Sequence, residues 1–517
     1  MLIQSISQWT VRLVNFMLDV GAHQNIQGSD FTWQKPTSPG SCLHNRVAFP
    51  DSKSYLDFLG SYWSVKEVDV RPNCIISPRS ATEVSQVVRV ITAKSQSLNE
   101  TCKFAIKGGG HTPFAGAANI DAGVVIRLDD LPSAGLAADH KTITVSPSTT
   151  WDEVFSVLDV FHLATLGGRV GGVGVGGLTT GCGISYFSPR FGFTCNMVEN
   201  FEVVLASGDV VNANATSNRP LWIALRGGSN NYGIVTSITL RTFSQGSFWG
   251  GQTFHPISTR KTHFKALENL IAQYPYDEYA HFINTVAISN LTRFWFIGNS
   301  LQYTKSDPPV PFPEVFKPFT DIPRISLFPG APDNTLRVDN HTAFTLEYAS
   351  LNVYPKRWQF ATVSFGNSAA MMEQFFLMAN ETIQPFVALP GFQLSISYQP
   401  MPTLLTERRD ALDSLGPIQT EGNMFFIHWA MAVDGSETKT DAIFQQAVQK
   451  LFRAAEKKAA ESNLQRSYLP LTYADSWQDP IGRRSKGTVE QMWRTSRAYD
   501  PDGVFQSLVP GGFKLPK

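Results

Sequence analysis

The pattern of apolar and polar positions predicts alternating strands and helices in the first half of the chain. Segments 74–76 and 104–106 are short apolar runs, typical of buried strands. Ser80 and Glu83 stand three residues apart, as in the capping box that begins a helix. After them apolar residues recur at helical spacing, at Val84, Val87, Val88 and Ile91. We therefore expect a strand, a crossover helix and a second strand.

The pattern changes near residue 244. Before it, short apolar runs predict strands at 124–128, 142–145 and 233–241 and a hairpin at 200–211. After it, longer strands are expected at 294–303, 392–398 and 424–433, and a helix at 440–460. We predict an α+β fold: an arm at 1–40, a first domain at 41–243, a second domain at 244–464 with an antiparallel sheet flanked by helices, and a segment at 465–517 that returns to the first domain.

Charge and composition exclude several classes of partner. The chain has 43 basic and 43 acidic side chains, which gives no electrostatic reason to expect nucleic acid. It contains no run of 18 apolar residues, so we expect no membrane span. Scattered Asn-x-Ser/Thr sequons favour a secretory route only weakly and leave the compartment open. A small-molecule ligand is the remaining class of partner.

The five cysteines do not indicate a metal site. No Cys-x-x-Cys pair occurs, so we expect neither zinc nor another bound metal. One disulfide bridge, between Cys42 and Cys102, is compatible with the sequence.

Three glycine-rich segments, at 107–116, 167–183 and 227–233, carry the strongest chemical signal. Glycine lets a backbone approach a ligand closely, and successive free N–H groups can hold a pyrophosphate. Three such segments in one half of a chain favour a dinucleotide cofactor over ordinary turns. Gly172, Gly174 and Gly177 also match the G-x-G-x-x-G fingerprint of nicotinamide cofactors, with Glu199 as the acidic partner. No clear strand precedes that match, so we reject this interpretation.

His111 is the reactive side chain of the first segment. It follows Gly108, Gly109 and Gly110, so neighbouring side chains leave its ring uncrowded. An imidazole nitrogen can add to the oxidised 8-methyl carbon of a flavin. The chemistry of the residue alone does not favour such a bond: it fits better with a histidine in a turn that forms a hydrogen bond to a phosphate group.

At these segments the sequence closely resembles the vanillyl-alcohol oxidase / p-cresol methylhydroxylase superfamily of FAD enzymes, in the fungal branch related to berberine bridge enzyme. The resemblance rests on the strand followed by Gly-Gly-His, the Gly-Gly-Arg-Val-x-Gly-Val-Gly-Val-Gly-Gly-Leu run, the segments 200–204 and 227–236, and the C-terminal Tyr-Asp-Pro-x-Gly-Val-Phe-Gln at 499–506. It implies that the first domain and the C-terminal segment together form a two-part FAD-binding domain of the p-cresol methylhydroxylase type, beside a substrate domain.

The resemblance also implies the residues that bind FAD. His111 is expected to carry the flavin 8α bond. The cysteine that forms a second bond in bicovalent members is replaced by Val170, so we predict one covalent link. In related oxidases, a valine at the position of Val173 allows dioxygen to reach the reduced flavin. The resemblance therefore favours an oxidase that releases hydrogen peroxide. The remaining predicted cofactor-binding residues are Gly108, Gly109, Gly110, Thr112, Gly172, Gly174, Gly176, Gly177, Gly181, Ser185, Gly233 and Val235.

The chain departs from the family pattern near the cofactor. The family has glycine at the positions of Ser148 and Cys182, Asp-Asn at Asn196-Met197, and Asn-Tyr-Ala at 472–474, where this chain has Thr-Tyr-Ala. These departures affect the expected mechanism more than the expected fold.

The resemblance leaves two residues as the base that takes the substrate proton. Tyr473 matches a motif expected close to the flavin. His428 alternates onto the same strand face as Phe426 and Ala430, although a purely structural histidine fits that pattern better. Three functions follow: an FAD-dependent oxidase of a small organic substrate in secondary metabolism, a cyclase of the Diels–Alderase kind that uses the same pocket, or a non-catalytic flavin- or ligand-binding protein.

Overall fold

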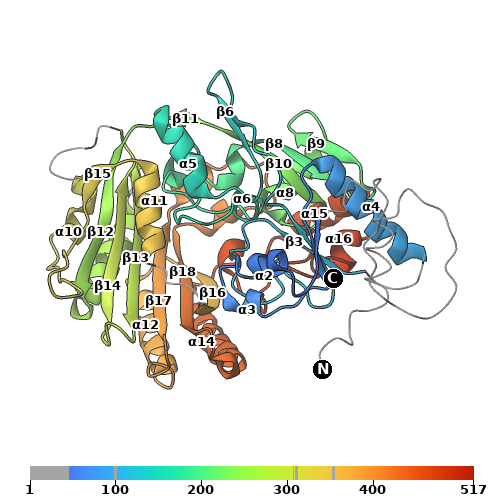
Figure 1. Cartoon of the computed structure of the whole chain (residues 1–517). Coiled ribbons are helices and arrows are strands. Elements are labelled where there is room, and N and C mark those ends of the chain that lie inside the picture. The colour runs from blue at the N-terminus through green and yellow to red at the C-terminus, as the bar shows by residue number, and fades with distance from the viewer. Residues whose placement is uncertain (1–45, 98–101, 307, 309–312, 352–355) are drawn as a thin grey trace.

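The computed structural model describes residues 46–97, 102–306, 308, 313–351 and 356–517. The predicted arm at 1–40 and Cys42 lie outside the described residues. Figure 1 shows a broad antiparallel sheet on one side of the molecule and several smaller sheets and helices on the other. The expected α+β fold is therefore confirmed, whereas the limits of the two domains stay a prediction.

The first small sheet has the strand order β1 (Val47–Ala48), β2 (Cys74–Ile76), β4 (Val124–Arg127), β3 (Phe104–Lys107). The predicted crossover helix is α4 (Ala81–Ser97). It joins β2 to β3, which are not adjacent, because β4 pairs in parallel with both of them. The first glycine segment begins at the last residue of β3, Lys107.

The second small sheet contains the predicted hairpin. Its strands run in the order β5 (Gly135–Leu136), β6 (Thr142–Val145), β10 (Ile234–Arg241), β8 (Val198–Val204), β9 (Val210–Asn214). A two-stranded ribbon of β7 (Leu163–Ala164) and β11 (Phe243–Ser244) adjoins it. The helices of this half are α2 (Lys53–Leu59), α3 (Val65–Val68), α5 (Trp151–Val160), α6 (Val175–Thr180), α7 (Ser188–Phe191) and α8 (Arg219–Gly228), with the 3₁₀ turn η2 (Thr194–Met197).

The second half forms one seven-stranded antiparallel sheet. Its order is β15 (Arg337–Asp339), β12 (Phe248–Pro256), β14 (Phe296–Tyr303), β13 (Ala280–Ser289), β17 (Gln393–Met401), β18 (Met424–Asp434), β16 (Lys356–Gly366). One face packs on α9 (Arg260–Ala272), α12 (Ala369–Ile383) and α14 (Asp441–Glu461) in a large apolar core. Because side chains alternate along a strand, the opposite face is free to line a site. The short helices α10 (Lys317–Thr320), α11 (His341–Ser350) and α13 (Thr403–Glu407) lie in the connections.

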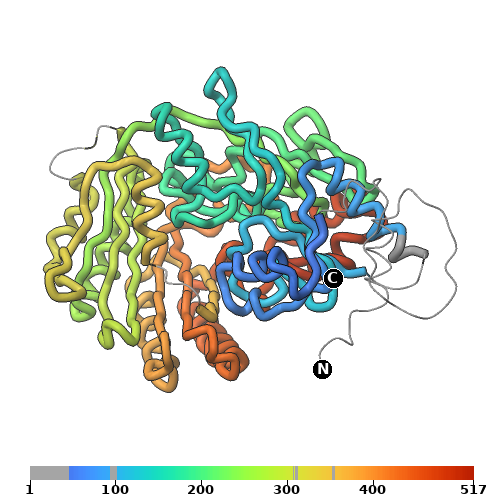
Figure 2. Tube along the Cα trace, viewed as in Figure 1, coloured from blue at the N-terminus to red at the C-terminus, as the bar shows by residue number. Residues whose placement is uncertain are grey.

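The C-terminal segment packs against elements of the first half. Figures 1 and 2 show α15 (Lys486–Tyr499) and α16 (Val504–Ser507) among the N-terminal elements. The ring of Phe505 meets that of Phe104 edge-on, with centroids 6.3 Å apart. Earlier in the segment, the turn η7 (Leu471–Tyr473) lies against β16 of the large sheet. The segment thus connects both halves of the molecule.

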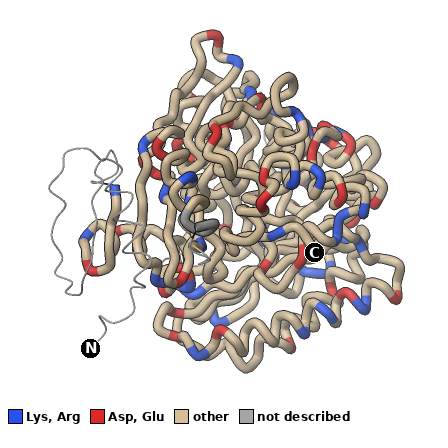
Figure 3. The backbone as a smooth tube through the Cα atoms, turned by 90° about the vertical axis from the view of Figure 1, so that its right-hand side faces the viewer, with Lys and Arg blue, Asp and Glu red and all other residues tan. Residues whose placement is uncertain are grey.

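A disulfide bridge joins Cys182 to Cys195, a pairing that the sequence interpretation missed. The bridge considered there, Cys42 to Cys102, involves a residue outside the described ranges. Figure 3 shows positive and negative residues interspersed along the backbone, in agreement with the balanced charge. Among the described helices, none is long and apolar enough to cross a membrane.

Candidate active site

A cavity of about 790 Å³ lies between the two halves of the molecule. One wall consists of the glycine segments, and the other is the free face of the seven-stranded sheet, with side chains from β12, β13, β14, β16, β17 and β18. The turn η7 and the C-terminal Phe513 complete the lining. A cavity of this size can enclose a cofactor ring together with a small organic molecule.

The glycine wall is formed by two backbones in direct contact. A Cβ atom placed on Gly109 would lie 2.6 Å from the main chain of Gly174, and one placed on Gly174 would lie 2.6 Å from Gly109. A Cβ on Gly176 would meet Pro147 at 2.7 Å. No side chain fits at these positions, so bare backbone faces the cavity, as binding of a dinucleotide requires.

Most predicted cofactor-binding residues line the cavity. They are Gly108, Gly109, Gly110, His111, Thr112, Val173, Gly174, Gly176, Gly177, Gly233 and Val235.

Three predicted residues do not line the cavity. Gly172 donates its main-chain N–H to Asp152 (2.7 Å), and the main-chain N–H of Ser185 donates to Ser188 Oγ (2.9 Å). A Cβ atom on Gly181 would lie 2.8 Å from Thr472 Cγ2. These residues shape the loops behind the lining, and any role in binding FAD stays a prediction.

The nicotinamide alternative has no support in the structure. Glu199, its would-be acidic partner, is exposed and forms an ion pair with Arg241 (3.2 Å). The two-residue strand β7 is the strand that precedes the glycine run. The fingerprint therefore lacks the long first strand of a βαβ unit.

His111 presents an unprotonated imidazole to the cavity. Its Nε2 atom is buried and has no hydrogen-bond partner among the described residues. Burial lowers the pKa of His111 to about 4, so the ring is neutral near pH 7. The ring stacks on the indole of Trp63, with centroids 4.5 Å apart. A neutral imidazole with a free lone pair is the form that can act as a nucleophile, so the residue fits the covalent role that the resemblance implies.

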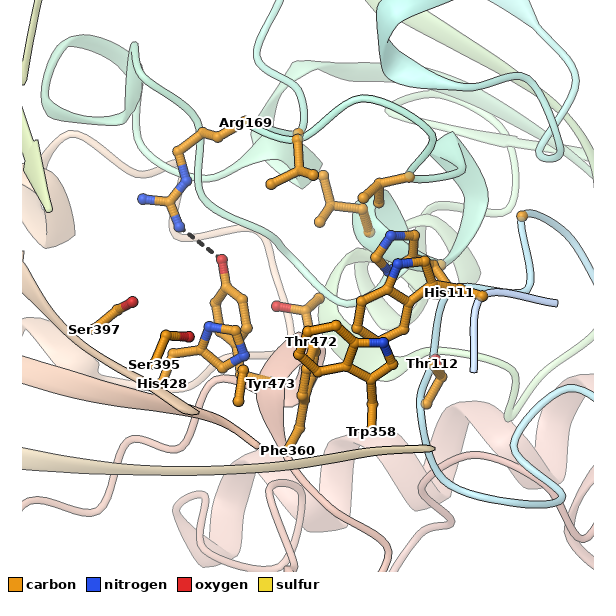
Figure 4. Close-up of a pocket in the computed structure, with 18 of the residues that line it drawn as sticks. His111, Thr112, Arg169, Trp358, Phe360, Ser395, Ser397, His428, Thr472 and Tyr473 are labelled. Atoms are coloured by element: carbon orange, nitrogen blue, oxygen red, sulfur yellow. Dashed lines mark hydrogen bonds between the residues drawn. The ribbon is translucent and has the colours of Figure 1, made fainter. Parts of the chain in front are cut away.

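Arg169 is a central residue of the site that the sequence interpretation did not single out, although it stands in the glycine run. Its guanidinium group crosses to the other half of the molecule, where it contacts β13, β17 and η7. It donates hydrogen bonds to His281 Nε2 (2.9 Å), Gln399 Oε1 (2.6 Å) and the hydroxyl oxygen of Tyr473 (2.6 Å). Figure 4 shows Arg169 above Tyr473, with this last bond marked.

The charge of Arg169 is not neutralised within the described part of the chain. Its side chain is only 6% exposed, and none of the ion pairs between described residues includes it. Since arginine only donates, Nε2 of His281 accepts, and Nδ1 of that ring faces Gln302 Oε1 at 3.1 Å. Burial, followed by the charge of Arg169, holds the pKa of His281 well below its usual range. The site therefore carries a buried positive charge beside the cavity.

Tyr473 and His428, the two predicted bases, lie side by side. Their ring centroids are 4.5 Å apart, and both side chains line the cavity (Figure 4). The hydroxyl oxygen of Tyr473 accepts from Arg169, so its own proton is free to point elsewhere. Burial, with smaller effects from Arg169 and His111, lowers the pKa of His428 to about 3. Such a weak base is poorly matched to proton abstraction near pH 7.

The sheet wall has a flat floor bounded by aromatic rings. Ala287, Ser395 and Ala430 are direct neighbours on β13, β17 and β18, and all three line the cavity. Phe296 and Phe360 stand at the two ends of this row. A neighbouring row adds the hydroxyl groups of Thr285 and Ser397, which hydrogen bond to each other at 2.9 Å. Small side chains along the first row leave room for a substrate between the two aromatic rings.

The family departures have structural explanations. Cys182, in place of glycine, forms the disulfide bridge to Cys195. Ser148 Oγ donates to the carbonyl oxygen of Leu128 (3.1 Å). Asn196 accepts from the main-chain N–H of Phe193 through Oδ1 (2.9 Å). These side chains stabilise loops around the cavity.

Comparisons with known proteins agree with this geometry. Residues 72–214 match a family described as FAD binding domain. The chain is 54% identical over 507 residues to FAD-dependent monooxygenase CTB5 of Cercospora beticola, covering 96% of each chain. It is 73% identical over 334 residues to FAD-dependent monooxygenase elcE of Phaeosphaeria nodorum, covering 64% of this chain and 97% of the relative.

Solved structures share the fold at low identity. A variant of berberine bridge enzyme superposes with a TM-score of 0.71 at 14% identity, over 91% of this chain and 97% of that chain. 6-Hydroxy-D-nicotine oxidase from Arthrobacter nicotinovorans does so with a TM-score of 0.70 at 15% identity, also over 91% and 97%.

Proposed function

Because the chain belongs to the FAD-linked oxidoreductases of the vanillyl-alcohol oxidase / p-cresol methylhydroxylase superfamily, related to berberine bridge enzyme, we propose that it oxidises a small organic substrate in fungal secondary metabolism. Bound FAD supplies a hydride acceptor and, once reduced, an electron donor to dioxygen. The observation that carries the proposal is one cavity lined on one side by the glycine wall and His111, and on the other by Tyr473 and the flat floor.

In this proposal, His111 carries the single covalent bond to FAD. Its ring lines the cavity with Nε2 unpartnered among the described residues, and its lowered pKa keeps the ring neutral. Val170 stands where a second bond would require cysteine and also lines the cavity. We expect the flavin to remain attached to the wild-type chain after acid denaturation.

In its phenolate form, after its own hydroxyl proton has passed to solvent, Tyr473 would receive the proton that a substrate hydroxyl group loses as its neighbouring C–H bond is oxidised. Arg169 donates to the Tyr473 oxygen at 2.6 Å, and a cationic donor stabilises negative charge on that atom. His428, neutral and with Nε2 unpartnered among the described residues, forms a hydrogen bond to the substrate. The flat floor orients the ring system of the substrate.

Dioxygen is the proposed second substrate. Val173 lines the cavity in the glycine run and leaves more room than a larger side chain would. The relatives are named monooxygenases, and that activity also consumes dioxygen. Release of hydrogen peroxide would indicate an oxidase, whereas transfer of oxygen into the product would indicate a monooxygenase.

The test is a metabolite screen in which purified protein is mixed with each compound without oxygen and flavin absorbance is followed. A substrate should bleach the yellow colour, and admitting oxygen should restore it with peroxide as product. Conversion without bleaching would favour a cyclase, and no bleaching by any compound that binds would favour a ligand-binding protein. In parallel, His111→Ala should retain the fold and release its flavin in acid. Flavin that stays attached to this variant would place the bond on another residue.

A further inference from the structure

Three aromatic rings stack in a column beside the cavity. The imidazole of His111 lies on the indole of Trp63, with centroids 4.5 Å apart and planes 17° apart. The indole of Trp63 lies in turn on that of Trp358, at 4.6 Å and 19°. Trp63 comes from the turn between α2 and α3, and Trp358 from β16 of the large sheet. This three-ring stack therefore joins the two halves of the molecule at His111.

The middle ring of the stack is held from several directions. The main-chain N–H of Trp63 donates to the carbonyl oxygen of Gly110, directly before His111 (3.2 Å). The next residue, Ser64, forms a parallel bridge with Lys356 at the start of β16. The ring of Phe360 meets Trp63 edge-on, with centroids 5.3 Å apart. Trp63 is 6% exposed and Trp358 2% exposed, so both indoles are fixed by packing.

The imidazole of His111 depends on this packing for its orientation. A reactive or ligating histidine is commonly oriented by a hydrogen bond from one ring nitrogen to a carboxylate or carbonyl group. In His111, Nε2 has no such partner among the described residues, and the hydrogen bond that acts on the ring is to its own main chain. The stack on Trp63 is the contact that fixes the ring plane.

We propose that Trp63 is a positioning residue for the covalent attachment of FAD to His111. Stacking keeps the imidazole plane in the orientation from which its nitrogen lone pair reaches the flavin 8-methyl carbon. This inference rests on the proposed function, since it requires the bond at His111. In forming the bond, the methyl group and the imidazole each lose one hydrogen and a C–N bond replaces the C–H and N–H bonds. Dioxygen takes the two protons and two electrons released in this exchange and becomes hydrogen peroxide.

The test compares the rate of covalent attachment in apoprotein from flavin-depleted cells. FAD is added in air, samples are denatured in acid at intervals, and flavin fluorescence that migrates with the chain is measured. Total bound FAD is measured separately on native protein. Trp63→Leu should slow attachment about tenfold, equivalent to ~1.4 kcal/mol in the barrier, while total FAD binding stays within about twofold. Trp63→Phe, which keeps an aromatic ring, should give an intermediate rate.

Trp249→Leu is the matched control. Trp249 is 5% exposed and stacks on Phe316 (centroids 5.8 Å apart), but it packs in the core behind the large sheet. This variant loses a comparable buried indole and should attach FAD at the wild-type rate.

The outcomes separate the inference from the proposed function. A wild-type chain with no acid-stable flavin would refute the covalent bond itself. Attachment at the wild-type rate in Trp63→Leu, with the bond present in wild type, would overturn the role of Trp63 alone. If Trp63→Leu does not fold, Trp63→Phe and Trp358→Leu decide, because each loosens the stack without removing it. Unchanged rates in both would overturn the inference.

Discussion

The contact between Gly109 and Gly174 allows a quantitative test of the glycine wall. In Gly109→Ala, the new Cβ would lie 2.6 Å from the main chain of Gly174, whereas carbon atoms pack at about 3.5–4 Å. The two backbones must separate by roughly 1 Å, because neither can rotate away as a side chain could. Overpacking of this kind costs about 1–3 kcal/mol, and backbone on both sides places the cost near the upper limit.

Gly177→Ala is the matched substitution, with the opposite sign for stability. Gly177 lies in α6, and a Cβ there would meet nothing within 4 Å. Alanine is favoured over glycine in a helix by about 0.5–1 kcal/mol, so the apoprotein should become slightly more stable. Because Gly177 lines the cavity, the methyl group should nevertheless weaken FAD binding. Gly109→Ala should therefore lower both the stability of the fold and the affinity for FAD, whereas Gly177→Ala should lower only the affinity.

The assay uses the His111→Ala background, in which FAD can be removed. The melting temperature of the apoprotein should fall by roughly 3 °C for Gly109→Ala, at about 1 °C per kcal/mol for a chain of this length, and should not fall for Gly177→Ala. FAD titration followed by flavin fluorescence should show weaker binding for both. Gly109→Ala apoprotein that melts at the control temperature and binds FAD normally would refute the proposed contact between the two glycine segments.

Two further predictions concern the proton path and the pH dependence of stability. Tyr473→Phe should slow anaerobic flavin reduction by about 100-fold or more with FAD content unchanged, as loss of a proton-transfer group does. Arg169→Lys should also slow it, because an ammonium group cannot reach three acceptors at once, and an unchanged rate in either variant would exclude that residue from the step. His341 is 2% exposed, and burial lowers its pKa to about 3. Below pH 6.5 the unfolded chain therefore binds a proton on this imidazole that the folded chain does not bind. Its effect is to reduce stability as the pH falls from 6.5 toward 3, so His341→Phe should stabilise the protein by about 2 kcal/mol more at pH 5 than at pH 7.5 in urea unfolding. Equal effects at the two pH values would show that burial does not lower the pKa of His341.

The elements predicted from periodicity are present, but the sequence did not predict which elements lie next to one another in the fold. The apolar stripe of α4 lies inward, with Val84, Val88 and Ile91 fully buried. The position of β4 between β2 and β3 was not predictable, since strand order depends on contacts between distant segments. The bridge between Cys182 and Cys195 was not predictable either, because several pairings of five cysteines are compatible with the sequence.

The site was predictable where glycine spacing carries the chemistry. It was not predictable where one long side chain acts at a distance. Arg169 stands among glycines, and its three acceptors come from residues 281, 399 and 473. No local pattern connects these positions. His428, by contrast, was a candidate because the resemblance implies a base on the second-domain sheet and strand alternation places the residue on the face of Phe426 and Ala430. The structure supplies the burial that makes it a weak base.

The reach of Arg169 constrains the construction of chimaeras. A designer who wishes to change substrate preference would exchange the strands of the large sheet between relatives and keep the cofactor half. Such an exchange separates the guanidinium group from the partners that hold it, His281 and Gln399. A hybrid that brings in different side chains there keeps the hydrogen bond from Arg169 to Tyr473 but loses the two to the sheet. The exchange should therefore move Arg169, His281, Gln399 and Tyr473 together as one unit.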